Sequence, residues 1–298
     1  MSLIPLTNKK LKKIVCVYQL DYINGKSPGL GDFLRGCFYV MQLSKLLNLE
    51  FDIDFSNHPM SKYIESHQDK NCSINYNNLE FVKGLNRPPH LWYDPNIFMN
   101  PYFANEIVNK LNNYKNSDTF SLLSNAFPIN YNFLDEGRNF VKSKLTPNKF
   151  MQDYIDLTFN ELQLEKNTYA TIHIRTGDQY LTKTRNISLN YLNQIITQIY
   201  KIVVPNKKYL IISDSNDVKQ YFNLKPKFYV VIREIEHLGG EAIKLQGNKT
   251  NGVMNTLLDF YLMSYSNAIF SMTSYGHVSG FSHYCSIIYK IPFKIIDN

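Results

Sequence analysis

The chain lacks several patterns that would mark a secreted, membrane-spanning or zinc-binding protein. No C-x-x-C pair occurs, and its four cysteines lie far apart, at Cys16, Cys37, Cys72 and Cys285. This spacing argues against a zinc site and a disulfide framework, and it favours a reducing compartment. The N-terminal residues include no apolar stretch long enough for a signal peptide, and no uncharged apolar run approaches a membrane span. We therefore expect a cytoplasmic protein without a transmembrane segment.

The motifs of several large functional classes are also missing. The sequence contains no G-K-[ST] P-loop, no H-E-x-x-H, no G-x-S-x-G and no kinase signature. His277 and His283 are six residues apart, which is poor spacing for shared metal ligation on a helix. The net charge of +7 suggests anionic partners, but the basic residues are scattered and no RNP, zinc-finger or KH pattern is present. We therefore expect no nucleic-acid partner.

The chain does have the composition and periodicity of a globular α/β protein. It has 298 residues, of which 44% are hydrophobic, enough for one large or two ordinary domains. A strand at 12–20, a glycine loop, a helix at 32–48 and a strand at 50–55 form a βαβ opening. Later, strands and helices alternate, with strands at 169–175, 208–214, 227–232 and 267–271. We predict two Rossmann-like domains with doubly wound parallel sheets, at 1–147 and 148–298.

The residues at the strand ends are candidates for a site, because ligands of such sheets bind beyond the carboxyl ends of the strands. In "HIRTGD", alternation places His173 and Arg175 on one face of the strand. Arginine stays charged and donates in a plane, which suits a diphosphate. Asp178, three residues on, is a further ligand-binding candidate; the alternative is a structural Arg175–Asp178 pair. After the next strand, Asp214 and Asp217 are interpreted first as helix caps and second as ligand contacts.

Two loops could offer backbone amides to an anion. "SPGLGD" places Gly29 and Gly31 before a helix, where amides point outward; an ordinary tight turn is an equal alternative. The G-x-G-x-x-G pattern fails, since Leu34 stands at the third glycine position. "FSMTSYG" offers hydroxyls at what we predict to be a helix start, which suits phosphate or an ordinary N-cap. The hydroxyl residues are Ser271, Thr273 and Ser274.

The segment "FDIDF" raises a metal-dependent alternative. Asp52 and Asp54 form a D-x-D on one face of a strand, and hard cations such as Mg²⁺ prefer carboxylates. We favour the simpler interpretation, a polar face on an early strand.

Three of these segments together resemble a family. "HIRTGD" resembles the H-x-R-x-x-D-type motif of fucosyltransferases that use GDP-fucose, the group with α1,2-, α1,6- and protein O-fucosyltransferases. "SPGLGDFLRG" resembles their N-terminal glycine loop, and 256–276 resembles their last motif. The resemblance implies a GT-B fold, in which two Rossmann-like domains face a cleft and the C-terminal one binds the donor. It also implies inversion at the sugar carbon without a metal.

The resemblance also implies roles for individual residues. Arg175 would hold the diphosphate and stabilise the leaving group, and His173 would lie near the nucleoside or phosphate. Asp259 would contact the guanine or ribose, and phosphate oxygens would be bound by Ser271, Thr273 and Ser274. The chain departs from the H-x-R-R variant, because Thr176 follows Arg175; Arg185 is the candidate to compensate.

The general base is expected to be a carboxylate that deprotonates the acceptor hydroxyl. Asp32, which stands where many relatives have asparagine, is the first candidate, and Glu241 is the second. The expected function is therefore transfer of fucose from GDP-fucose to a glycan hydroxyl. Three alternatives remain: another nucleotide-sugar donor, a metal-dependent D-x-D transferase, and a non-catalytic glycan- or nucleic-acid-binding protein on this scaffold. Acceptor recognition is expected within 56–147.

Overall fold

The chain forms two compact units of α/β structure in the computed structural model. One unit comprises Met1–Ser61 and Glu65–Leu145, and the other comprises Lys62–Ile64 and Thr146–Asn298. Among the described residues, no helix is both long enough and apolar enough to cross a membrane. The structure describes residues 3–22, 25–66, 74, 76, 79–82, 101–130, 132–177, 187–239, 250–275 and 277–297.

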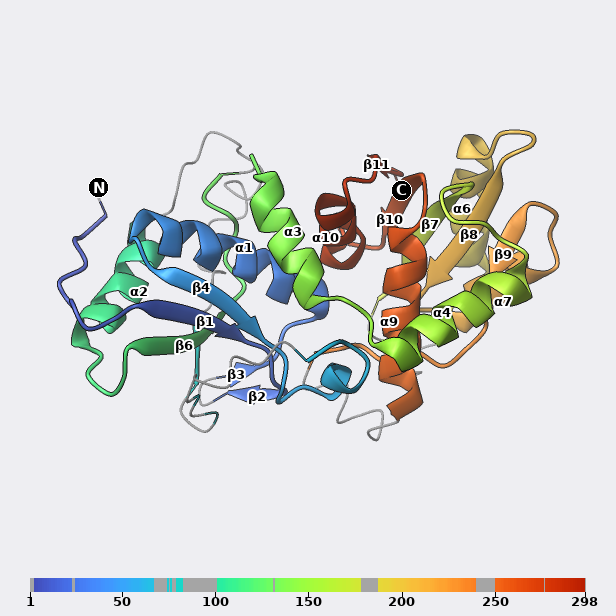
Figure 1. Cartoon of the computed structure of the whole chain (residues 1–298). Coiled ribbons are helices and arrows are strands. Elements are labelled where there is room, and N and C mark those ends of the chain that lie inside the picture. The colour runs from blue at the N-terminus through green and yellow to red at the C-terminus, as the bar shows by residue number, and fades with distance from the viewer. Residues whose placement is uncertain are drawn as a thin grey trace. The chain divides into compact units, whose positions relative to one another are not determined.

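The first unit is built on a four-stranded parallel sheet with the order β4-β1-β6-β5. The strands are β1 (Lys13–Val17), β4 (Glu50–Asp54), β5 (Glu80–Val82) and β6 (Thr119–Ser124). Two short strands form an antiparallel pair between β1 and α1: β2 (Asp21–Tyr22) and β3 (Gly25–Lys26). A 3-10 turn, η1 (Pro59–Lys62), follows β4. The helices are α1 (Leu30–Leu46), α2 (Pro101–Asn113) and α3 (Asp135–Lys144) (Figure 1).

Helix α1 packs closely against the sheet of the first unit. It carries the predicted βαβ opening, but it begins two residues earlier than predicted, with Gly29 as its N-cap. Gly36 is the point of closest approach: a β-carbon there would lie 1.5 Å from the backbone oxygen of Ser124, at the end of β6. Only a residue without a side chain allows the helix to lie this close to that strand end.

The second unit contains a five-stranded parallel sheet with the order β11-β10-β7-β8-β9. Its strands are β7 (Tyr169–Arg175), β8 (Lys208–Ser213), β9 (Phe228–Val230), β10 (Ala268–Thr273) and β11 (Phe293–Ile295). Its helices are α4 (Lys149–Leu162), α6 (Leu189–Ile202), α7 (Asn216–Asn223), α9 (Thr250–Ser264) and α10 (Gly280–Tyr289). In chain order the strands run 5-4-1-2-3, which is the Rossmann order.

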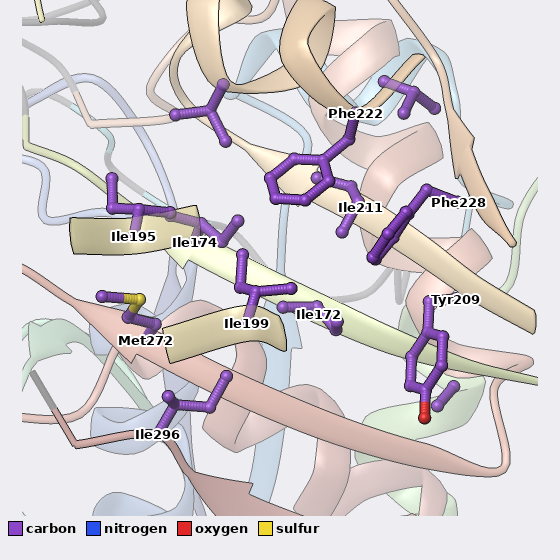
Figure 2. Packing of buried hydrophobic residues seen from close by; sticks show 13 residues of the cluster. Ile172, Ile174, Ile195, Ile199, Tyr209, Ile211, Phe222, Phe228, Met272 and Ile296 are labelled. Carbon is purple, nitrogen blue, oxygen red and sulfur yellow. The ribbon is translucent and has the colours of Figure 1, made fainter. Parts of the chain in front are cut away.

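Both faces of this sheet are covered, as a parallel sheet requires. On one face, Ile172 and Ile174 of β7 pack with side chains of α6 and α7, including Ile199 and Phe222 (Figure 2). On the other face, His173 of β7 meets Ser282 of α10. The alternation along β7 therefore separates a purely apolar layer from a layer that contains polar groups.

The chain order reverses between β7 and β10, which makes this pair the topological switch point of the sheet. β7 and its following helix lead towards β8, whereas β10 lies on the opposite side of β7. Loops at the carboxyl ends of such a pair diverge and leave a crevice, where ligands of open α/β sheets bind. The fold therefore identifies the ends of β7 and β10 as the place to look for a site.

Candidate functional site at the switch point

The ends of β7 and β10 bring two of the predicted segments together. Arg175 is the register partner of Thr273, and His173 is the partner of Ser271. Beyond the strands, the Ser274 amide donates to the Arg175 oxygen at 3.0 Å, and the Ser274 hydroxyl donates to the Thr176 oxygen at 2.8 Å. The described residues of "HIRTGD" and "SMTSYG" therefore lie side by side at one edge of the sheet.

The guanidinium of Arg175 is held by a carboxylate from the neighbouring strand. Its Nη1 lies 2.7 Å from Oδ2 of Asp214, and the Arg175 side chain is 14% exposed. The sequence suggested Asp178 as a structural partner for this arginine; Asp178 lies outside the described residues. Asp214 follows β8, which pairs with β7, so its side chain lies at the same edge of the sheet.

Asp214 does not cap the next helix, contrary to the first interpretation of the sequence. The N-cap of α7 is Ser215, whose hydroxyl accepts from the Val218 amide. The Asp214 carboxylate instead accepts from the loop after β7, through Thr176 and Gly177. Because Asp and Ser are both good caps, the pattern "SDSND" could not show which one caps α7.

His173 lies one step below the edge, in a buried hydrogen-bonded group. Its Nδ1 is 3.0 Å from the Ser282 hydroxyl, which is also 3.0 Å from the Ser271 hydroxyl. Burial is the main reason that the pKa of His173 is lowered from 6.5 to about 4; the charges of Arg175 and Lys219 act in the same direction, and Asp214 opposes them. The imidazole is therefore neutral at pH 7, and Ser271 is bound to Ser282.

Asp259 lies inside the second unit, in an ion pair. Its Oδ2 is 3.4 Å from Nζ of Lys219, and the two side chains are 6% and 1% exposed. Burial raises the pKa of Asp259, while the ammonium of Lys219 acts in the opposite direction. The guanine or ribose contact that the resemblance implied for Asp259 stays a prediction. Lys219 was missed from the sequence, because a lysine in a short amphipathic helix gives no sign of burial.

Thr273 is the last residue of β10 and Ser274 begins the loop after it, so neither lies at a helix start and that prediction is wrong. Helix α10 begins at Gly280, and the segment after β10 turns back on itself first. The Thr273 hydroxyl donates to the backbone oxygens of Tyr275 and His277. These bonds give two loop carbonyls a hydrogen-bond donor from the end of β10. Ser274 lies exposed beside Arg175, whose backbone oxygen accepts from the Ser274 amide.

In the first unit, the glycine loop forms the N-terminus of α1. Gly29 has extended backbone and no side chain to cap the helix, and its oxygen accepts from the Phe33 amide. Gly31 is buried in the first turn. Asp32 is half-exposed, and it lies 2.8 Å from Nη1 of Arg35.

Arg35, which the sequence interpretation did not single out, holds the carboxylate of Asp32. Its Nε donates to the Asn125 oxygen at 2.9 Å, and its guanidinium carbon lies 4.3 Å from the centre of the Phe127 ring. The guanidinium is therefore fixed between a carbonyl, a ring and the carboxylate of Asp32. The i, i+3 spacing of Asp32 and Arg35 on a predicted helix was the available signal.

The two aspartates of the D-x-D are occupied by protein groups. Asp52 lies between Lys13, at 3.1 Å, and Lys144, at 2.6 Å. Asp54 accepts from the Ser56 amide and hydroxyl and from the Tyr76 hydroxyl. Among the described residues, no group of three or more His, Cys, Asp or Glu side chains could hold a metal ion. Glu241 and Arg185, both predicted candidates, lie outside the described residues.

Comparisons with known proteins find similarity in structure and none in sequence. No protein-family model and no curated protein matches the chain. The fucosyltransferase NodZ from Bradyrhizobium matches 94% of this chain and 94% of its own, with 14% identity and a TM-score of 0.50. NodZ α-1,6-fucosyltransferase soaked with GDP-fucose matches 94% and 93%, with 15% identity and a TM-score of 0.52. The crystal with GDP gives a TM-score of 0.52 at 14% identity. The chain therefore has the GT-B fold that these fucosyltransferases share, as its sequence predicted.

Proposed function

We propose that this protein is an inverting glycosyltransferase that moves fucose from GDP-fucose to a hydroxyl of a glycan acceptor without a metal ion. One observation carries the proposal: Arg175 lies at the switch point of a Rossmann-type sheet, beside Thr273 and Ser274. The shared fold supports it, because NodZ was co-crystallised with GDP and its crystals were soaked with GDP-fucose.

The chemistry asks for positive charge where the leaving group departs. An acceptor oxygen attacks the sugar carbon, the bond from that carbon to the phosphate oxygen breaks, and GDP leaves with the electron pair. Negative charge grows on the diphosphate during this step, so a fixed guanidinium near it lowers the barrier. Arg175 would supply that guanidinium. Ser274 is exposed at the same edge, and its hydroxyl would turn from the Thr176 oxygen that it binds in this structure to donate to a phosphate oxygen.

The proton of the acceptor hydroxyl needs a base. Asp32 is the proposed base in the first unit, with its carboxylate oriented by Arg35. Asp32→Asn keeps the shape of the side chain and removes the base. We expect it to lower kcat about 100-fold or more while GDP binding is unchanged. Unchanged turnover in this variant would transfer the role to another group, with Glu241 next in order.

A nucleotide screen tests the donor assignment directly. The thermal unfolding midpoint is measured with GDP, UDP, ADP and CMP, each with and without EDTA. We expect GDP alone to raise the midpoint, by an amount that EDTA does not change, because ligand binding to the folded state stabilises it. A preference for UDP would point to another donor, and loss of the effect in EDTA would contradict metal independence.

Arg175→Ala provides the matching test of the site. We expect it to reduce turnover of GDP-fucose by about 10³-fold, the size of effect that follows the loss of a group stabilising transition-state charge. Arg138→Ala is the control, because Arg138 lies on α3 and pairs with Asp135 at the surface of the first unit. Equal turnover in wild type and Arg175→Ala would overturn the proposal.

A further inference from the structure

The loop after β7 is wrapped around a single carboxylate. Both oxygens of Asp214 accept two hydrogen bonds. Oδ1 accepts from the Thr176 amide at 2.7 Å and from the Thr176 hydroxyl at 2.7 Å. Oδ2 accepts from Nη1 of Arg175 at 2.7 Å and from the Gly177 amide at 3.0 Å. The Asp214 side chain is only 4% exposed, so these four bonds are shielded from water.

The backbone of the loop is shaped for this contact. Two successive amides, of Thr176 and Gly177, converge on the carboxylate, an arrangement that binds anions. Gly177 has a φ of 126°, a conformation that side chains disfavour. The loop therefore uses a glycine to aim its amides at Asp214, and the strand end is fixed by the same four bonds that hold the carboxylate.

This arrangement fixes one end of the Arg175 guanidinium. An arginine side chain has several rotatable bonds, and ordering it at the moment of reaction costs free energy. Here its Nη1 already donates to the buried carboxylate of Asp214, which also accepts three hydrogen bonds from Thr176 and Gly177. The backbone on the other side is held as well, because the Arg175 oxygen accepts from the Ser274 amide.

We infer that Asp214 and Thr176 are positioning residues that orient Arg175 towards the donor diphosphate. This inference rests on the proposed function, and it explains the departure at position 176. Thr176 is fully buried, so a second arginine has no room there. Its hydroxyl instead completes the shell around Asp214. A small hydroxyl residue at this position is thus a working part of the clamp formed by Thr176, Gly177 and Asp214.

Asp214 could instead inhibit donor binding, and this role predicts different effects on kcat and on GDP affinity. A carboxylate in an anion-binding loop could occupy the place of a phosphate and compete with the donor. Removing its charge would then strengthen GDP binding and leave kcat intact. A positioning role predicts instead that kcat falls and that GDP affinity does not improve, so the two are separated by one pair of measurements.

Two substitutions at Thr176 test the clamp, one without the hydroxyl and one with it. Thr176→Val keeps the shape and deletes the hydroxyl, and we expect kcat to fall about tenfold with the donor KM changed less than threefold. Thr176→Ser keeps the hydroxyl and should restore turnover to within about threefold of wild type. Thr197→Val is the matched control: the Thr197 hydroxyl donates to the Asn193 oxygen on the exposed face of α6. We expect it to leave turnover unchanged.

Asp214→Asn is the stronger test. The asparagine side chain has one oxygen and one NH₂ group, and the NH₂ group cannot accept a hydrogen bond. In one orientation this group faces the amide and hydroxyl of Thr176, and in the other it faces the donors of Arg175 and Gly177. We expect kcat to fall about 100-fold, with GDP affinity unchanged or weaker. Wild-type turnover in Thr176→Val or in Asp214→Asn, or tighter GDP binding in the latter, would overturn the inference.

A second readout keeps the clamp separate from the donor assignment. The ¹⁵N signal of the Arg175 guanidinium reports its order without any substrate, and Arg175→Lys assigns it. We expect a slowly exchanging Arg175 signal in wild type and Thr176→Ser, and a broadened one in Thr176→Val. If GDP does not raise the unfolding midpoint of wild type but the three proteins show this pattern, the donor assignment is refuted and the positioning role of the clamp stands. Identical signals in all three proteins would refute the clamp, whatever the response to GDP.

Discussion

His173 shows how burial decides what a residue in a motif can do. The imidazole lies beneath the strand edge, bound to Ser282 and surrounded by the charges of Arg175, Lys219 and Asp214. Because burial disfavours the charged form, the ring stays neutral at pH 7. It can therefore accept or donate a hydrogen bond at the site, but it contributes no charge to a diphosphate.

The neutral imidazole should make the protein less stable in acid. The pKa of His173 falls from 6.5 to about 4 in the folded state. Between these values the unfolded state binds more protons than the folded state. The stability that the neutral His173 contributes is therefore complete above about pH 6.5 and is lost progressively towards pH 4. The loss is at most about 3 kcal/mol. Urea unfolding at pH 7 and pH 4.5 measures it.

A substitution isolates this contribution. His173→Gln is neutral at every pH, so the fall in unfolding free energy between pH 7 and pH 4.5 should be smaller in this variant. His277→Gln serves as the control, because His277 is exposed after β10. The idea fails if wild type and His173→Gln lose the same free energy over this range.

At the scale of elements, the contact of α1 with β6 sets how the first unit packs. The helix carries Asp32 and Arg35 on its first turns, and Gly36 lies directly against the end of β6. The carbonyl of Asn125, immediately after β6, binds Arg35. The close approach at Gly36 therefore also determines where the Asp32–Arg35 pair lies.

Replacing Gly36 tests this contact. Gly36→Ala would place a β-carbon 1.5 Å from the Ser124 oxygen, a backbone atom that cannot rotate away. Although alanine favours helices by about 1 kcal/mol, we expect a net destabilisation of about 1–3 kcal/mol from overpacking. Chemical denaturation would measure it.

Gly137→Ala is the matched control on α3. There the new β-carbon would lie 2.8 Å from Cε of Met41, a flexible side-chain end that can move. We expect stability to be unchanged or to rise by up to about 1 kcal/mol. If both variants behaved alike, the close approach of α1 to β6 would not govern the packing.

Elements with strong local patterns were predictable, and those defined by distant partners were not. Strand β7 combines β-branched residues with a polar end, so its bounds follow from its own sequence. Strand β6, "TFSLLS", is short and rich in serine, and we did not predict it. It exists as a strand because β1 and β5 pair with it on both sides. Its neighbours supply what its own pattern lacks.

For the whole molecule, the order of strands in the second unit matters most to the site. Strands β7 and β10 are nearly a hundred residues apart in sequence, yet their ends meet because parallel strands share one edge. The rule for parallel sheets therefore predicted that Arg175 and Ser274 would be close. No rule predicted that Asp214 would bind Arg175, or that Lys219 would pair with Asp259, since side-chain pairs between elements depend on packing.

Hydrogen exchange of the whole chain tests where GDP binds. We expect GDP to slow exchange of amides at the ends of β7 and β10 and to leave the centre of β1 and β4 unchanged, because bound ligand suppresses local opening near it. Peptide-level mass spectrometry resolves these segments. Protection confined to the sheet of the first unit would contradict the assignment of the donor to the second.

The segment Lys62–Ile64 makes the two units inseparable as sequence modules. It lies far before the rest of the second unit in the chain, yet Asn148 binds the backbone oxygens of Lys62 and Tyr63, and Ile64 bridges to Pro147. An exchange of residues 1–147 between proteins of this fold would remove these three residues from the second unit. A folded chimera would have to take Lys62–Ile64 from the same protein as its second unit.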